Sequence, residues 1–287
     1  MAIRTKYGDI TPAEKDYALE LLYKKEPIKE VARLTGLNHN EVLSICFNKG
    51  IMVRKNQLPF CRLEDREILI YSDFHSGGIY EKPTYKTKIK EYAEEHNIRT
   101  LINCGDEFQS NIEPFYHDVR WQTNVAKMAR VEKHLTTYLV GGNHDYDAIT
   151  KNPELGEIIE RRKDIIFAGF RIAYFEWQGH LIKCYHPIHN LDIKIPNVET
   201  EIIFEGGRHY YIAKCFTSKG GLKRTKAFVP PSCDDIKMPG AVPGFLVASL
   251  DNNELEIRVN TFKRDPKSGK GATIIETGVQ YSRKLKR

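Results

Sequence analysis

The stretch GGNHD, residues 141–145, directly follows the apolar run TTYLV, and it decides the fold class. An apolar run of this length is typical of a buried strand. Packing gives no reason to place Asn143, His144 and Asp145 at the end of such a strand. Amide, imidazole and carboxylate groups at a strand end are typical of a metal or catalytic site, which needs similar groups at neighbouring strand ends.

Four other apolar runs in the chain end in the same kind of residue. These runs are EILIYSDFH (67–75), TLINCGDEF (100–108), LIKCYHPIH (181–189) and EIIF (201–204), the last of which continues into GGRH. The groups that they supply are, in chain order, Asp73, His75, Asp106, His186 and His209. A helical pattern at 85–97 separates the strands at 67–75 and 100–108, and another at 119–135 separates the latter from the strand before GGNHD. This alternation predicts an α/β fold whose chemistry lies at the strand ends.

The types of side chain in this series indicate which metal they would bind. Oxygen and imidazole ligands without thiolates favour a pair of divalent ions over a structural zinc site. We expect Mn²⁺, with Fe²⁺, Zn²⁺ or Ni²⁺ as alternatives. A single histidine after a strand is more often a hydrogen-bonded core or surface residue, so the prediction depends on the whole series.

The blocks YSDFH, NCGD, GGNHD and CYH resemble, in this order, the motifs of the calcineurin-like metallophosphoesterases. The resemblance covers roughly residues 67–262. It implies a four-layer α/β/β/α sandwich that holds two divalent ions and hydrolyses phosphoesters. The implied ligands of the first metal are Asp73, His75, Asp106 and His209. Asp106 would bridge to the second metal, which Asn143 and His186 would also hold.

The resemblance also implies roles for two residues that are not ligands. His144 would protonate the leaving oxygen or stabilise phosphate charge, and Asp145 would orient it. One block departs from the family pattern, because the family ends with Gly-His-x-His. Gly207 stands where the last ligand of the second metal belongs. That site would be weaker, or would be completed by water or His189.

The first part of the chain predicts a separate small domain, residues 1–58, before the phosphoesterase domain at 59–287. Thr11-Pro12-Ala13-Glu14 is a capping box, and three short helical patterns follow. Residues 11–51 resemble the homeodomain-like helix-turn-helix of resolvases, which places its last helix in the DNA major groove. The outward positions of that helix would be His39, Asn40, Ser44, Asn48 and Lys49. The alternative is a three-helix bundle used for packing or as a homodimer contact.

Composition and charge limit the partners. The net charge is +6, and residues 206–232 hold six Lys/Arg and no Asp/Glu. Local basic charge favours a polyanionic partner. No apolar run is long enough to span a membrane, and the N-terminal residues lack a secretory h-region, so we expect a cytoplasmic protein with no membrane partner. The six cysteines contain no CxxC pair and are expected to be reduced.

These features favour a nuclease that acts on DNA, with Arg208 and Lys214 as substrate contacts beside the metals. One alternative is a phosphatase or pyrophosphatase acting on a small phosphoester, similar to UDP-diacylglucosamine pyrophosphatases. Another is a DNA-binding regulator with a degenerate metal site. A β-hairpin at 245–262 is predicted to close a sheet, followed by a basic C-terminal tail.

Overall fold

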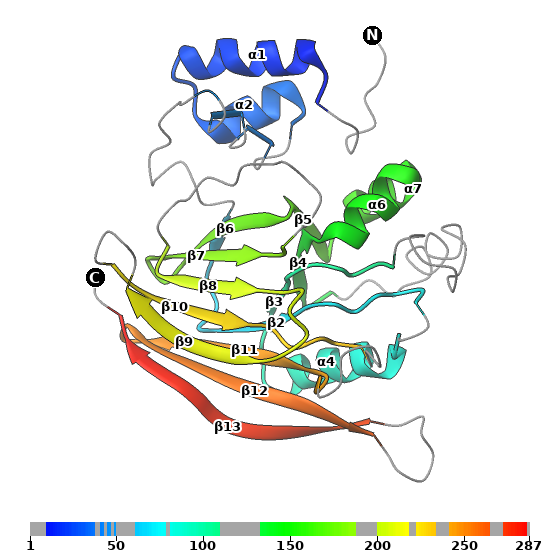
Figure 1. The fold of residues 1–287 in the computed structure, drawn as a ribbon, viewed down its shortest axis with the longest axis vertical. Helices are drawn as coiled ribbons and strands as arrows, with labels where there is room; N and C mark the ends of the chain where they lie inside the picture. Colours follow the sequence, from blue (N-terminus) through cyan, green and yellow to red (C-terminus); the bar gives the residue numbers. More distant parts are fainter. Residues whose placement is uncertain are drawn as a thin grey trace.

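The structure is a computed structural model that describes residues 10–37, 41–42, 45–46, 49, 61–78, 81–109, 133–187, 200–217, 222–233, 241–264 and 272–285. Two β-sheets pack face to face (Figure 1). The seven-stranded sheet consists, in spatial order, of β13 (Ala272–Lys284), β12 (Glu254–Arg264), β11 (Gly244–Asp251), β2 (Glu67–Tyr71), β3 (Thr100–Asn103), β4 (Thr136–Gly141) and β5 (Ile165–Phe170).

The six-stranded sheet lies on the other side of the main core. In spatial order it consists of β1 (Cys61–Leu63), β6 (Ile172–Trp177), β7 (His180–Tyr185), β8 (Ile202–Glu205), β10 (Lys223–Phe228) and β9 (Ile212–Thr217). Apolar side chains from both sheets fill the space between them, including Ile70, Ile102, Phe175 and Phe204. β2 and β3 bury both faces, which explains why their sequences are continuous apolar runs.

Helices cover the outer faces of both sheets. They are α1 (Pro12–Tyr23), α2 (Ile28–Thr35), α4 (Pro83–Glu95), α6 (Asn143–Lys151) and α7 (Pro153–Arg161). α4 packs Tyr85, Ile89 and Tyr92 against the seven-stranded sheet. Within the described residues, no helix is long and apolar enough to cross a membrane. The predicted α/β sandwich with flanking helices is confirmed.

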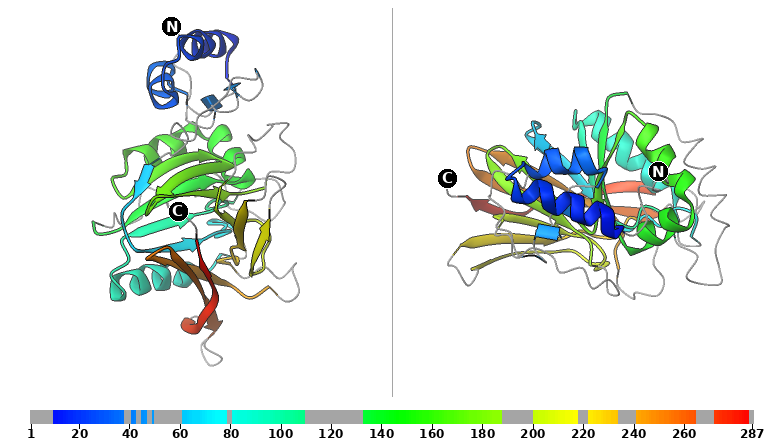
Figure 2. Two further views of the ribbon diagram at one scale, coloured as in Figure 1. Left: turned by 90° about the vertical axis from the view of Figure 1, so that its left-hand side faces the viewer. Right: turned by 90° about the horizontal axis from the view of Figure 1, so that it is seen from above.

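The N-terminal helices lie over the six-stranded sheet (Figure 2). The predicted capping box at the start of α1 is present, since Thr11 and Glu14 exchange hydrogen bonds. Side chains of α1 and α2 share one buried apolar cluster with Ile172, Tyr174 and Leu181 on the outer face of β6 and β7. These helices therefore form the outer layer over this part of the sheet. The predicted boundary at residue 58 lies outside the described residues.

Parallel pairing brings the important strand ends together. β2, β3 and β4 are parallel neighbours, and β7, β8 and β10 are parallel neighbours in the other sheet. A bridge between Ser72 and Pro231 joins the two sheets at this edge. Since the carboxyl ends of parallel strands meet at one edge, the residues that follow them converge.

Two segments differ from the sequence predictions. The hairpin at 245–262 is present as β11 and β12, but it is not the last pair, because β13 adds to β12 over residues 272–284. The predicted basic tail is thus largely an edge strand, and its β-branched residues fit that role. Within segment 206–232, β9 and β10 form a hairpin that the sequence pattern did not predict. Most of the predicted helix at 119–135 lies outside the described residues.

Candidate metal centre

The loop after β2 carries Asp73 and His75 in an unusual backbone conformation. Their φ angles are 55° and 52°, in the left-handed region that non-glycine residues seldom adopt. The backbone N–H of Asp73 donates to the carbonyl of Gly105 (2.8 Å), and that of His75 donates to the carbonyl of Asp106 (2.9 Å). These bonds join the loops after β2 and β3. Strained conformations of this kind concentrate at functional sites, where surrounding contacts fix them.

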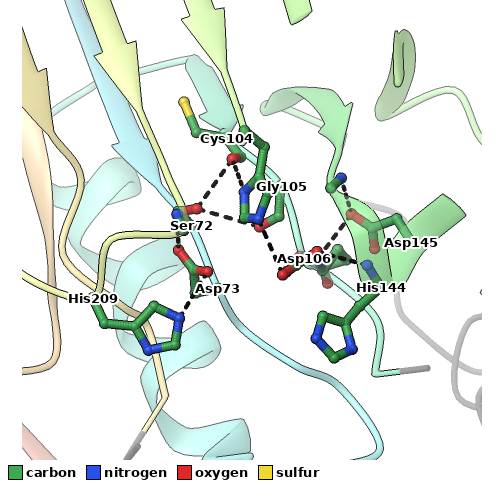
Figure 3. Close-up of polar contacts among 12 residues, drawn as sticks. Ser72, Asp73, Cys104, Gly105, Asp106, His144, Asp145 and His209 are labelled. Atoms are coloured by element: carbon green, nitrogen blue, oxygen red, sulfur yellow. Dashed lines mark hydrogen bonds and ion pairs between the residues drawn. The ribbon is translucent and has the colours of Figure 1, made fainter. Parts of the chain in front are cut away.

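Asp106 lies at the centre of the site, with its side chain almost fully buried. Its Oδ2 is 3.1 Å from Nε2 of His186, and its Oδ1 accepts a hydrogen bond from the backbone N–H of His144 (3.0 Å). Figure 3 shows Asp73 and Asp106 between the rings of His209 and His144. Asp106 therefore contacts groups from the ends of β4 and β7.

The loop after β4 explains the second glycine of the opening motif. Gly142 precedes α6, so Asn143 and His144 are the first two residues of that helix. A Cβ on Gly142 would lie 2.1 Å from Oδ1 of Asp106 and 2.7 Å from its backbone N. Only glycine lets this backbone approach the carboxylate so closely.

We therefore expect Gly142→Ala to cost about 1–3 kcal/mol of stability, as overpacking does, and to lower activity and metal affinity more than tenfold. Urea unfolding and metal titration measure these effects. Gly179→Ala is the control, because Gly179 has a φ of 82° but open space around a Cβ. It should cost some stability and leave metal affinity unchanged. Wild-type metal affinity in Gly142→Ala would show that the close approach is unimportant.

Asp145 is fully buried, and its carboxylate binds backbone N–H groups instead of the His144 ring. Its carboxylate accepts hydrogen bonds from the N–H groups of Gly142 (2.8 Å), Phe108 (2.8 Å) and Glu107 (3.2 Å). Burial and the charge of Asp106 raise the pKa of Asp145 to about 7. Asp145 thus fixes the loops after β3 and β4, and it positions His144 through the backbone.

His144 has a side-chain neighbour that the sequence did not indicate. Its Nδ1 lies 3.1 Å from Nε2 of Gln109, and its ring packs edge-on against His75 at 4.8 Å. An amide N–H of Gln109 that donates to Nδ1 leaves the ring proton on Nε2. Gln109 follows Asp106 by three residues, and no sequence pattern marks it as a partner of His144.

The loops after β7 and β8 complete the site. Nδ1 of His186 donates to the carbonyl of Cys104 (2.7 Å), which leaves Nε2 facing Asp106. Nε2 of His209 lies 3.1 Å from Oδ1 of Asp73. The backbone N–H of Gly207 donates to Oδ2 of Asp73 (2.9 Å). A Cβ at Gly207 would lie 2.9 Å from Nε2 of His186, so this position supplies a backbone donor and has no room for a ligand side chain.

The residues at this edge fit divalent ions. Three sets of His and Asp ligand atoms each lie within 4.8 Å of one another, and the sets are Asp73–His75–His209, His75–Asp106–His144 and Asp73–Asp106–His186. Nδ1 of His75 is buried and has no hydrogen-bond partner among the described residues. A buried imidazole nitrogen without a partner is costly unless a ligand satisfies it. His189 lies outside the described residues.

The pKa values show how strongly these groups interact. Burial lowers the pKa of His186, but the Asp106 carboxylate outweighs this effect and raises it to about 10. Burial raises the pKa of Asp73, yet the hydrogen bond and charge of His209 lower it overall. Burial lowers the pKa of His75. Without metal, His186 therefore carries a proton at neutral pH.

Metal binding is expected to release that proton, because a ligating imidazole must be neutral. The proton is bound in the free state and lost in the bound state. Raising the pH should therefore increase metal affinity by roughly tenfold per unit up to about pH 10. Calorimetry with Mn²⁺ in buffers of different ionisation enthalpy measures the released proton. Affinity that stays constant between pH 6.5 and 8.5 would contradict this expectation.

The other predicted site residues lie beyond the cluster of ligand atoms or outside the described residues. Arg208 follows Gly207, and its Nε contacts Oε1 of Glu205 (2.7 Å). Lys214 is exposed on β9. Of the predicted DNA contacts, Lys49 is exposed. The remaining ones, His39, Asn40, Ser44 and Asn48, lie outside the described residues.

Comparisons with known proteins agree with this geometry. A family model for calcineurin-like phosphoesterases matches residues 66–221, more than half of the chain. No curated protein sequence matches this chain significantly.

Solved structures are similar to this chain at low sequence identity. Vps29 from Chaetomium thermophilum is 12% identical over 74% of this chain and 95% of its own, with a TM-score of 0.42. A protein from Streptococcus pneumoniae described as a predicted phosphoesterase is 12% identical over 75% and 99%, with a TM-score of 0.39. The nuclease MPE of Pseudomonas putida is 14% identical over 72% and 87%, with a TM-score of 0.37.

Proposed function

The chain belongs to the calcineurin-like phosphoesterase family, a group of hydrolases that act on ester bonds, and from this premise we propose that it is a Mn²⁺-dependent phosphodiesterase acting on DNA. The observation that carries the proposal is a buried cluster of Asp and His ligand atoms beside a strongly basic segment. The cluster supports hydrolysis, and the basic segment supports a polyanionic substrate.

Two groups of residues would hold the ions. We assign Asp73, His75 and His209 to one ion and Asn143 and His186 to the other, with Asp106 shared. Two bound divalent ions would neutralise the phosphodiester and activate a water for in-line attack. The backbone N–H groups of Gly207 and His144 hold the carboxylates of Asp73 and Asp106 in place. Because Gly207 supplies no side chain, we expect the second ion to bind more weakly.

His144 is the proposed general acid. It lies at the start of α6, where its ring is half-buried beside His75. The contact with Gln109 favours the tautomer that keeps a proton on Nε2. A proton on Nε2 can pass to the leaving oxygen of the substrate. Asp145 keeps the backbone under His144 in position through its three backbone hydrogen bonds.

Basic residues in the loop after β8 and on β9 support DNA as the substrate. Arg208 lies one residue before His209, with 43% of its side chain exposed. Lys214 projects from β9, the edge strand of the same sheet. Phosphate contacts of this kind contribute affinity that falls steeply with salt. We further propose that the N-terminal helices contact duplex DNA near Lys49.

The test compares substrates and metals. Wild-type protein with Mn²⁺ is expected to degrade or nick DNA, and EDTA should abolish the reaction. Efficient hydrolysis of p-nitrophenyl phosphoesters without any DNA cleavage would favour a small-phosphoester hydrolase. DNA binding without hydrolysis in Mn²⁺, Fe²⁺, Zn²⁺ or Ni²⁺ would favour a regulator. Either of these two results would overturn the proposal.

A further inference from the structure

The outer face of the six-stranded sheet carries a row of lysines beside the metal centre. Strand pairing places Lys183 on β7, Ile203 on β8, Lys226 on β10 and Lys214 on β9 in one line. Their neighbours along the strands point into the core between the sheets. Side chains alternate along a strand, so the lysines face outward. Adjacent strands are about 4.8 Å apart, so the row spans roughly 14 Å.

This row lies two residues before the carboxyl ends of β7, β8 and β10, where the loops with the metal ligands begin. The next outward-facing line consists of Tyr185, Glu205 and Phe228, which are register partners at the carboxyl ends of β7, β8 and β10. His186 directly follows Tyr185, and His209 follows Glu205 by four residues. In the described part of the chain, the apolar cluster under the N-terminal helices includes residues of β6 and β7 but none of β8, β9 or β10. Ile203, Glu205 and Phe228 are buried, so the exposed part of this face lies at Lys214 and Tyr210, beside the partly exposed Lys226.

Two aromatic rings lie at the exposed part of this face. Tyr210 follows His209, is 44% exposed, and packs against the ring of Phe228 at 5.2 Å. Nζ of Lys226 lies 4.8 Å from the centre of the Phe228 ring, and Nζ of Lys214 lies 5.7 Å from it. Tyr211, by contrast, packs against the core. Tyr210 thus offers an exposed ring surface next to both a metal ligand and two cations.

Among the described residues of this face, basic side chains outnumber acidic ones. Glu205 is the buried carboxylate among these cations, and it pairs with both Arg208 and Lys226. Burial, together with the charges of Arg224 and Lys226, lowers the pKa of Lys183 to about 8. Crowded like charges of this kind favour an anion that neutralises them. A phosphate backbone is such an anion.

We propose that this face binds single-stranded DNA, with a base stacked on Tyr210 and neighbouring phosphates at Lys214 and Lys226. This inference rests on the proposed function, because the bound strand would continue into the metal centre. Stacking on Tyr210 requires a base whose face is free, which a duplex does not offer. Base–aromatic stacking and backbone contacts together are the usual means of binding single strands.

The experiment measures binding by fluorescence anisotropy of a labelled oligo-dT strand in EDTA, so that no cleavage occurs. Tyr210→Ala is expected to weaken binding roughly 5- to 160-fold, since stacking contributes about 1–3 kcal/mol per base. Tyr210→Phe should restore it. Lys214→Ala should reduce the slope of log K against log salt by about 0.7. Lys88→Ala, on the exposed face of α4, is the matched control and should change neither value.

Wild-type protein should bind the single strand more tightly than it binds a mixed-sequence duplex of the same length. Equal binding of the single strand by wild type and Tyr210→Ala, or a preference for duplex that Tyr210→Ala leaves unchanged, would overturn the inference. The binding measurements test this inference even if wild-type protein cleaves no DNA. Absence of cleavage would overturn only the proposed function.

Discussion

Asp106→Asn is expected to reduce hydrolysis of bis(p-nitrophenyl) phosphate with Mn²⁺ by more than about a hundredfold, which exceeds the usual loss from an outer-shell partner. The substitution keeps the shape of the side chain and removes its charge. Asp106 contacts His186 and the backbone of His144, and it belongs to two of the three sets of ligand atoms. Losing this carboxylate should therefore weaken both ions at once.

The readouts are the turnover rate and the number of Mn²⁺ ions bound per chain, measured by calorimetry. Asp251→Asn is the matched control, because Asp251 is largely exposed and pairs only loosely with Arg66 at 4.0 Å. It should behave as wild type in both measurements. If Asp106→Asn bound two ions with wild-type affinity, Asp106 could not be the shared ligand.

His144→Ala is expected to lower turnover by roughly 10²- to 10⁴-fold on substrates with poor leaving groups, the usual contribution of a general acid. The loss should be much smaller on p-nitrophenyl esters, whose leaving oxygen needs little protonation. Metal content should stay unchanged, because the proposed ligands remain. The measurements are turnover on both kinds of substrate and metal content of the purified protein.

A second explanation makes this test necessary. His144 also lies in one set of ligand atoms with His75 and Asp106, so it has the position of a possible ligand. If it were a ligand, His144→Ala would lose metal and would slow both substrates equally. His96→Ala, at the end of α4, serves as a control for loss of a partly exposed imidazole.

The convergence of the site could be predicted from the sequence. Asp73, Asp106 and His144 each follow an apolar run, and parallel strands bring their carboxyl ends to one edge. His186 and His209 follow strands of the second sheet in the same way. The structure places all five residues together, as predicted from the strand ends.

Contacts between loops could not be predicted, because no periodic pattern encodes them. Asp145 binds backbone N–H groups from the loop after β3, and Gln109 in that loop contacts His144. The role of Gly207 as a backbone donor to Asp73 depends on a φ of 69°, which the sequence does not reveal.

Pairing between distant segments was also missed. β13 follows a segment outside the described residues, and the basic residues on either side of it obscured its β-branched strand pattern. The packing of α1 and α2 on β6 and β7 depends on Ile172, Tyr174 and Leu181, whose outward direction follows only from the sheet register. Such long-range pairings leave little trace in local sequence.

The central claim is that two divalent ions bind side by side at this edge of the sandwich. Anomalous X-ray scattering from crystals grown with Mn²⁺ tests it most directly. The expected map shows two peaks about 3.5–4 Å apart, one beside Asp73, His75 and His209 and the other beside Asn143 and His186, with Asp106 between them. A map with no peak at these residues, or with metal bound elsewhere, would contradict the account.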